Sequence, residues 1–271
     1  IYKIVDTINQ MPITTVYKNL ITFATTGVKD FGPIQLGPYF YLYSSNRVEG
    51  SRFRISVATP KSLKDFQFTG YVAYGTRDGR FKYGVTGKWM IDRSPWTYLF
   101  AYHTHDVSQS TNYYDQFGAD NIFSTLFRKR GIPWKLAFTD DNRFEFYKQY
   151  FNGLSHKLIM QHTTFTPYNP LPSTGIFTDI SASRSSFATS AEVGLDLRFA
   201  YKEKYLEGQF TRVSVKSKYP TIGLYVGAGV KGVVNSAYEY QKARVSVTGL
   251  NNIAPFGTVY YNVFAGKYFS S

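Results

Sequence analysis

The sequence predicts an all-β protein, an antiparallel up-and-down transmembrane β-barrel of about twelve strands with short helices. Three observations favour this fold class. Apolar and polar residues alternate with period two over many segments, turn residues separate these segments, and none of the 271 residues belongs to an apolar run long enough for a membrane-spanning helix. We expect residues 1–34 to form a periplasmic segment and residues 35–271 to form an outer-membrane β-barrel.

The alternation is clearest where Val193, Leu195 and Leu197 lie on one side of a strand, with Glu192 and Asp196 on the other. The segments often reach ten or more residues, which exceeds the usual length of about 5–6 in globular proteins and matches the roughly 9–11 that cross a bilayer. This length favours a membrane protein. The predicted strands are 35–44, 52–57, 66–74, 81–91, 98–105, 144–150, 154–165, 192–202, 209–215, 222–230, 238–247 and 258–268.

The predicted connections differ in length between the two ends of the strands. Short turns near 60–65, 92–95, 152–153, 203–206 and 233–237 fall at one end. The long segments Thr111–Asn142 and Pro167–Ser186 fall at the other. This asymmetry is typical of outer-membrane barrels, whose long loops face outward. A soluble β-sandwich, which would place the mid-strand charges on its outer surface, remains the alternative.

Two segments have helical rather than strand periodicity. Pro12 suits the first position of a helix that ends at Gly27, and one face carries the apolar residues Ile13, Val16, Tyr17, Leu20 and Ile21. We expect this amphipathic helix on the periplasmic side, where it either plugs the lumen or lies beneath it. A second short helix is predicted at Asn121–Arg130, inside the first long loop.

The composition is strongly basic and lacks cysteine. Lys and Arg number 31 against 18 Asp and Glu, a formal charge of +13. The absence of cysteine excludes disulfides, thiolate metal sites and a cysteine nucleophile. The cations are dispersed, which favours contact with lipopolysaccharide phosphates and charge balance inside a lumen over nucleic-acid binding. Because the sequence begins at Ile1, we expect a processed or truncated product.

Residues with catalytic or metal-binding chemistry form no convincing set. His103 and His105, with Asp106 beside them, would need a ligand from another strand to hold a metal. His156 and His162 are about 20 Å apart along one strand and cannot share an ion. The paired carboxylates Asp140-Asp141 are interpreted as part of a solvated turn, and Ser108 with the two nearby histidines is the only loose hydrolase candidate. We therefore expect no enzyme, and no catalytic, cofactor or metal residues.

Two blocks of sequence carry a resemblance to a known family. Val48-Glu49-Gly50 and the run from Tyr74 to Gly84 resemble the uncharacterised Bacteroidota outer-membrane proteins that join an N-terminal carboxypeptidase-regulatory-like domain to a β-barrel of unknown function. The similarity continues through Gly153–Lys157 to Gly266-Lys267. It implies an outer-membrane location, with the regulatory-like domain absent here and further strands after Gly266-Lys267 in family members.

The function that we expect is a structural, assembly or transport component of the bacterial envelope. An incomplete barrel leaves strand edges at 35–44 and 258–268, and unpaired backbone groups cannot stay in hydrocarbon. These edges therefore predict a larger envelope complex or additional strands. The lipid and lipopolysaccharide of the outer membrane are the other expected partners. A substrate-translocating pore is the alternative, and an outer-membrane hydrolase is the second alternative.

Overall fold

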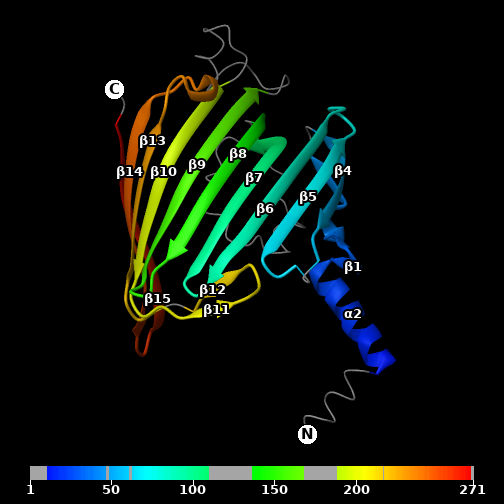
Figure 1. The fold of residues 1–271 in the computed structure, drawn as a ribbon, viewed down its shortest axis with the longest axis horizontal. Coiled ribbons are helices and arrows are strands. Elements are labelled where there is room, and N and C mark those ends of the chain that lie inside the picture. The colour runs from blue at the N-terminus through cyan, green and yellow to red at the C-terminus, as the bar shows by residue number, and fades with distance from the viewer. Residues whose placement is uncertain are drawn as a thin grey trace. The chain divides into compact units, whose positions relative to one another are not determined.

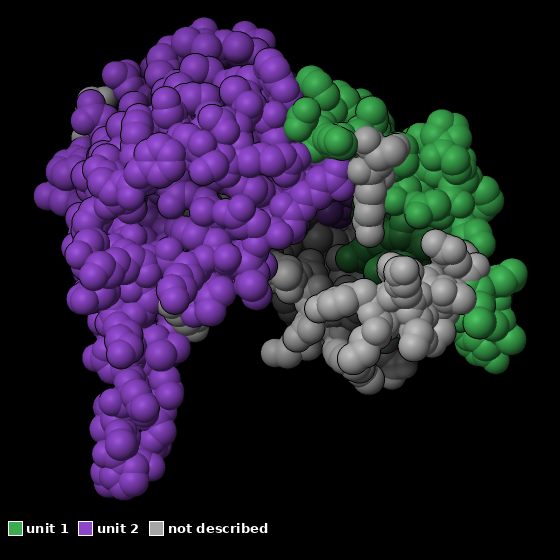
Figure 2. All heavy atoms as spheres, turned by 60° about the horizontal axis from the view of Figure 1, so that its bottom comes forward, with its two compact units in different colours: residues 1–85 green, residues 86–271 purple. Residues whose placement is uncertain are grey.

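The computed structural model describes residues 11–46, 49–60, 63–109, 136–167, 188–215 and 217–269. Within this part of the chain, the fold is all-β and antiparallel, with fifteen strands, one α-helix and two short 3-10 helices (Figure 1). The contacts divide the chain into two compact units, residues 1–85 and 86–271 (Figure 2). Strand β6 (Phe81–Arg93) runs from the first unit into the second. Among the described residues, none of the helices combines the length and the hydropathy that a membrane-spanning helix requires.

The first unit contains one helix followed by a small sheet, which has the strand order β1-β2-β4-β5 and β3 paired with β4. Its elements are α2 (Pro12–Thr26), β1 (Lys29–Phe31), β2 (Ile34–Leu36), η1 (Tyr39–Tyr41), β3 (Tyr43–Asn46), β4 (Gly50–Ala58) and β5 (Phe66–Gly75). Helix α2 confirms the predicted amphipathic helix. Pro12 occupies its first turn, and Gly27 ends it in the left-handed conformation (φ 74°), where its N–H donates to the Phe23 carbonyl.

The prediction of one continuous strand over 35–44 is wrong. The chain leaves β2 after Leu36, because Gly37 has a φ of 123° and Pro38 has no N–H for a ladder. Residues Tyr39–Tyr41 then form the single 3-10 turn η1 before β3 begins. Short pieces of this kind raise the number of strands above the predicted twelve.

The second unit has a seven-strand meander with the order β7-β8-β9-β10-β13-β14-β15, in which every neighbouring pair is antiparallel. Its elements are β7 (Trp96–Gln109), β8 (Leu136–Gln149), β9 (Leu154–Pro167), β10 (Ala188–Ala200), β13 (Thr221–Gly229), η3 (Val233–Asn235), β14 (Tyr240–Ile253) and β15 (Gly257–Phe269). The separate hairpin β11 (Tyr205–Glu207) and β12 (Arg212–Ser214) lies outside this meander.

Three predicted connections need correction. Strand β8 begins at Leu136, so the last part of the predicted loop Thr111–Asn142 is strand and pairs with β7. The segment 201–220 is not a short turn near 203–206 followed by a wall strand at 209–215, because β10 pairs directly with β13 and the hairpin lies between them in sequence. The connection near 233–237 follows β13, and antiparallel order therefore places it at the end opposite 150–153. The predicted helix Asn121–Arg130 and residues 168–186 of the second loop lie outside the described residues.

The two faces of the strands in the second unit differ in the kind of side chain that they expose and bury. We define its apolar face as the strand residues in register with Leu195: Phe144, Phe146, Leu158, Met160, Val193, Leu195, Leu224, Val226, Val245 and Val263. Val193, Leu195 and Val226 on this face are 43%, 38% and 47% exposed. The polar face is its reverse: Tyr102, Asp141, Glu145, Gln161, Thr163, Glu192, Asp196, Arg198, Tyr225 and Lys242. Asp141, Glu145 and Thr163 on this face are buried.

Candidate functional site

The polar face of the second unit holds a network of interacting side chains. Near the middle of β8, Asp141 has no exposed area. It accepts hydrogen bonds from the Tyr102 hydroxyl (2.5 Å), the Thr163 hydroxyl (2.7 Å) and the Gln161 amide (3.0 Å). The interpretation of Asp140-Asp141 as a solvated turn is therefore wrong, because these residues lie within β8. Asp141 joins β7, β8 and β9, and three donors saturate its oxygens.

A second carboxylate joins the next three strands along the same face. Glu192 on β10 accepts hydrogen bonds from the hydroxyls of Tyr225 on β13 and Tyr240 on β14, and forms an ion pair of 2.7 Å with Lys242. The Tyr225 ring also packs over Gly194, where an added Cβ would lie 2.9 Å from its Cζ atom. Charge-assisted hydrogen bonds of this kind are short and strong. Asp141 and Glu192 thus each link three successive strands of the meander.

The β11–β12 hairpin lies across the polar face and contacts strands that are distant in sequence. Phe210 at its tip is buried in a cluster with Met90 and Trp96. Its carbonyl accepts a hydrogen bond of 2.6 Å from the ammonium of Lys88, and the carbonyl of Gln209 accepts one of 2.7 Å from Arg93. Both cations belong to β6. The hairpin therefore covers the one buried apolar cluster of the described residues at this end of the face.

Arg212 fixes the second strand of the hairpin. Its guanidinium lies 3.7 Å from the ring centroid of Tyr205 and 5.4 Å from that of Trp96. It also donates to the side-chain oxygen of Gln149 on β8 and forms an ion pair of 2.8 Å with Glu207. Planar stacking and directed hydrogen bonds are the interactions for which arginine is better suited than lysine.

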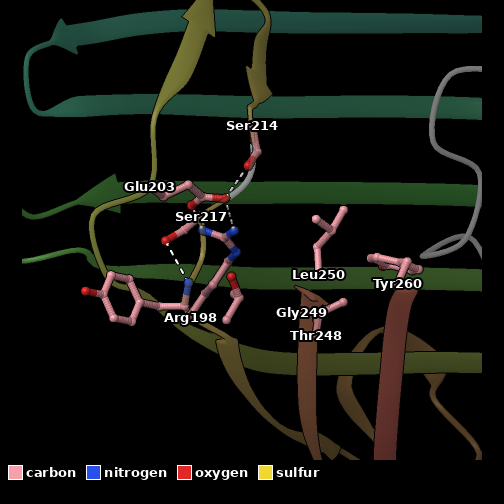
Figure 3. A pocket seen from close by; sticks show the side chains of 10 residues that line it. Arg198, Glu203, Ser214, Ser217, Thr248, Gly249, Leu250 and Tyr260 are labelled. Carbon is pink, nitrogen blue, oxygen red and sulfur yellow. Dashed lines mark hydrogen bonds and ion pairs between the residues drawn. The ribbon is translucent and has the colours of Figure 1, made fainter. Parts of the chain in front are cut away.

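Glu203 anchors the other side of the hairpin to β10, as Figure 3 shows. Its two carboxylate oxygens each pair with Arg198 at 2.7 Å, and the hydroxyls of Tyr205 and Ser214 donate to the same group. Burial opposes ionisation, but the hydrogen bonds from Arg198, Ser214 and Tyr205 outweigh it and lower the pKa of Glu203 to about 2. The carboxylate is therefore charged throughout the neutral range.

A pocket of about 200 Å³ opens beside this ion pair. Its lining residues come from β10, the hairpin segment, β13, β14 and β15: Arg198, Glu203, Ser214, Ser217, Tyr219, Thr221, Thr248, Gly249, Leu250 and Tyr260 (Figure 3). The only charged side chains in the lining pair with each other. The pocket thus has hydroxyl groups and two tyrosine rings, but its carboxylate is not available as a general base.

Three of the histidines that the sequence analysis considered each bond to a different partner. His103 bonds to the Asn142 side chain at 2.7 Å, and His105 bonds to Asp140 at 2.5 Å. The Nε2 atom of His162 lies 3.1 Å from the Val234 carbonyl oxygen. Among the described residues, no three groups of metal-ligating type come together. The Ser108 side chain, the third member of the loose hydrolase candidate, lies outside the described part.

A compact charge cluster in the first unit explains the two sequence blocks on which the resemblance rests. Lys82 has no exposed side-chain area and pairs with Asp78 at 2.5 Å and Glu49 at 3.0 Å, while Arg52 pairs with Glu49 at 3.0 Å. The Arg77 N–H also donates to the Glu49 carbonyl at 2.8 Å. One buried lysine thus pairs with a carboxylate from each block, Glu49 and Asp78, which is a structural role.

The comparison with family models decides the relationship of the chain. Residues 131–271, just over half of its length, match the C-terminal domain of the family of unknown function DUF5686. The chain belongs to the DUF5686 family. The predicted resemblance to a family of unknown function is confirmed at this level. No curated protein matches the chain.

The DUF5686 match covers most of the polar face and all of the hairpin. It begins before β8 and extends past β15, so Asp141, Glu192, Glu203 and Arg212 lie inside it. The Lys82 cluster lies outside the matched residues. Sequence reasoning missed the hairpin contacts, although one signal was present: seven of the twenty residues 201–220 are charged, which is too many for a strand that crosses a membrane.

Proposed function

We propose that this DUF5686 chain forms the wall of a β-barrel in the bacterial outer membrane and acts as a structural, assembly or transport component of the envelope. The observation that carries the proposal is the reversed distribution of side chains in the second unit. Val193, Leu195 and Val226 are exposed, whereas Asp141 and Glu145 on the opposite face are buried. Lipid is the solvent in which exposed apolar strand residues carry no cost.

Strand length supports the same proposal. Strands β7, β8, β9 and β14 each have 14 residues, and β10 and β15 have 13. About 9–11 tilted residues are enough to cross a bilayer. The remaining residues would extend beyond the hydrocarbon, where lipopolysaccharide phosphates would meet the basic side chains of a chain with a formal charge of +13.

The edge strand β15 supports a place in a larger wall. In the described residues it pairs with β14 alone, over the register from Gln241–Phe269 to Ile253–Gly257. It has one charged residue, Lys267, and no internal proline, whereas edges in water are usually protected by charges, prolines or short length. Either further strands or an envelope partner would satisfy its outer backbone groups. The proposal includes that the chain comes from the Bacteroidota outer-membrane proteins that carry an N-terminal carboxypeptidase-regulatory-like domain.

Purification from outer membranes in mild detergent, followed by identification of the copurifying proteins, tests the proposal. Recovery in the outer-membrane fraction together with assembly or secretion subunits would support it. Recovery as a soluble monomer without detergent would contradict it. The same purification of the Phe210→Ala variant shows whether binding of a copurifying subunit requires the docked hairpin.

A substrate pore is the second candidate, and the polar face favours it. Glu192, Asp196 and Arg198 would line a lumen, and the β11–β12 hairpin crosses that face. A pore predicts steady ion conductance in planar bilayers that rises when Phe210→Ala weakens hairpin docking. Electrically silent wild-type and Phe210→Ala proteins would remove this candidate.

A membrane hydrolase is the third candidate, and among the described residues the short His105–Asp140 pair favours it. A histidine held by a carboxylate can act as a general base when a nucleophile is near. Lipid or peptide hydrolysis that His105→Ala abolishes would support this candidate. Hydrolysis at the same rate in that variant would exclude a role for this pair.

A further inference from the structure

Helix α2 exposes a complete apolar stripe. Ile13, Val16, Tyr17, Leu20 and Ile21 are all 60–65% exposed, at the spacing of one helical face. The opposite arc carries Lys18, Thr22 and Thr25, which are also exposed. Figure 1 shows the helix as a projection from β1 of the same unit. In the described residues, its contacts are made at its C-terminal end only.

A helix of this composition needs a surface to remain folded. Five of its fifteen residues are threonine, and Met11 provides no side-chain cap for the first turn. Isolated helices of about 12–15 residues are marginal in water even with good helix formers, and threonine is a poor one. Most of its stability must therefore come from burying the stripe against something apolar.

Contacts with Tyr39 fix the C-terminal end of α2 next to the start of β1. The Tyr39 hydroxyl donates to the Ala24 carbonyl at 3.3 Å, and its ring lies 5.1 Å from that of Phe23. The Tyr39 N–H donates to the Gly27 carbonyl at 2.9 Å, and β1 starts at Lys29, two residues after Gly27. Strand β2, which pairs with β1, meets Val57 and Ala58 at the end of β4 in the same unit, so this end of the helix lies at a membrane–water interface if β4 crosses a bilayer.

The chemistry of the helix fits a lipid surface. It has one cation, Lys18, and no acidic residue, so nothing in it repels anionic headgroups. Fifteen residues span about 22 Å, less than the roughly 30 Å hydrocarbon core, so the helix is too short to cross. Helices with these properties lie in the interface with the apolar face immersed by about 5–10 Å.

We propose that α2 is an interfacial anchor, with Ile13, Val16, Tyr17, Leu20 and Ile21 immersed in the bilayer leaflet at the end of the strands where β1 begins. This inference rests on the proposed membrane location and narrows the expected periplasmic role of the helix. The helix lies on the lipid surface and does not enter a lumen.

Site-directed spin labelling of the full chain tests the anchor, because the chain contains no native cysteine. Single cysteines at Val16, Leu20, Asn19 and Leu195 are labelled in nanodiscs of phosphatidylethanolamine and phosphatidylglycerol. Collision with oxygen reports lipid, and collision with a water-soluble nickel chelate reports water. We expect labels at 16 and 20 to lie about 5–10 Å below the headgroups, and the label at 19 to be accessible from water.

A matched pair of substitutions checks that the stripe causes the immersion. Leu20→Asp should move the label at 16 into water, whereas Thr22→Asp on the opposite arc should leave its depth unchanged, and neither should move the label at 195. Nickel access at 16 and 20 equal to that at 19 would overturn the anchor, as would protection of both labels from both reagents, which indicates burial in protein. If either result is found while the label at 195 is accessible to oxygen and not to nickel, the anchor alone is refuted. If the label at 195 is accessible to nickel, the proposed function is refuted.

Discussion

Strand β10 and the segment 201–220 follow each other in the chain but fold differently. β10 carries three charged residues in 13, Glu192, Asp196 and Arg198, and all lie on the polar face. It pairs with β9 and β13 along most of its length. The segment 201–220 carries seven charges in twenty residues, and its two short strands pair only with each other.

The difference shows that alternation of apolar and polar residues does not by itself place a segment in the large sheet. Both segments alternate apolar and polar residues, as Leu206 and Val213 show in the hairpin. In the segment 201–220, however, Lys202, Glu203 and Lys204 are consecutive, so no register leaves one face free of charge. The hairpin instead lies on the polar face, where Arg198 and Lys88 supply partners.

The largest expected effect comes from removing the apolar contact of the hairpin. Phe210→Ala deletes a side chain that is buried against Met90 and Trp96, a change that costs about 3–5 kcal/mol in a packed core. We expect the amides of residues 205–214 to exchange hydrogen much faster, with those of β10 unchanged. Leu206→Ala, at a position 69% exposed, is the control and should have little effect. Equal exchange in wild type and Phe210→Ala would contradict the docking.

A charge introduced on the apolar face should have a much larger effect on stability than the same charge introduced in the hairpin. Leu195→Lys should destabilise the protein in bilayers by about 2–4 kcal/mol, because lysine near the midplane is not solvated. Leu206→Lys makes the same change in the hairpin and should alter the free energy of unfolding by less than about 0.5 kcal/mol. Urea titration in lipid vesicles measures both values. A similar loss in the two variants would mean that the apolar face does not meet lipid.

Packing inside the wall gives a smaller effect. Gly194→Ala places a Cβ against the Tyr225 ring, which should cost about 1–3 kcal/mol through overpacking. Gly70→Ala is the matched control, because its Cβ would meet its nearest neighbour at an ordinary 3.7 Å. Unfolding midpoints of the two variants in the same detergent compare them. If Gly194→Ala were as stable as Gly70→Ala, the Tyr225 ring could not lie over Gly194.

The smallest effect is the pH dependence of the hairpin. Because the pKa of Glu203 is lowered to about 2, its ion pair with Arg198 contributes fully above the ordinary value of 4.5 and is lost as the pH falls towards 2. The protection of the amides of residues 205–214 against hydrogen exchange, measured relative to the intrinsic exchange rate at each pH, should therefore fall between these values. Glu203→Gln should remove this dependence and accelerate exchange at neutral pH. A wild-type profile that is flat from pH 4.5 to 2 would show that the pair does not hold the hairpin.

The sequence predicted those parts of the fold that depend on local pattern. The helix from Pro12 to Gly27 and the two faces of β10 follow from helical and strand periodicity, and both are confirmed. The break at Gly37-Pro38 could have been predicted, since both residues interrupt a ladder. Asp141 could not, because a carboxylate is stable within a strand only when donors such as Tyr102 and Thr163 arrive from other strands.

The candidate site was harder to predict than the fold for the same reason. Lys88 and Phe210 are separated by more than a hundred residues, and no local spacing indicates that the ammonium meets this carbonyl. The histidines were identifiable by residue type, but their partners Asn142 and Asp140 were predicted to lie in the long loop Thr111–Asn142. Contacts between distant segments require the strand order, which periodicity alone does not provide.

The contact between lipid and the apolar face is the central claim, and methyl NMR in nanodiscs tests it most directly. Methyl groups of Val193, Leu195, Val226 and Val245 should show cross-relaxation with lipid acyl chains. Ile159, which is 6% exposed and lies on the polar face, should show none and serves as the internal control. Cross-relaxation of the four apolar-face methyl groups with water in place of acyl chains would contradict the membrane location and the function proposed from it.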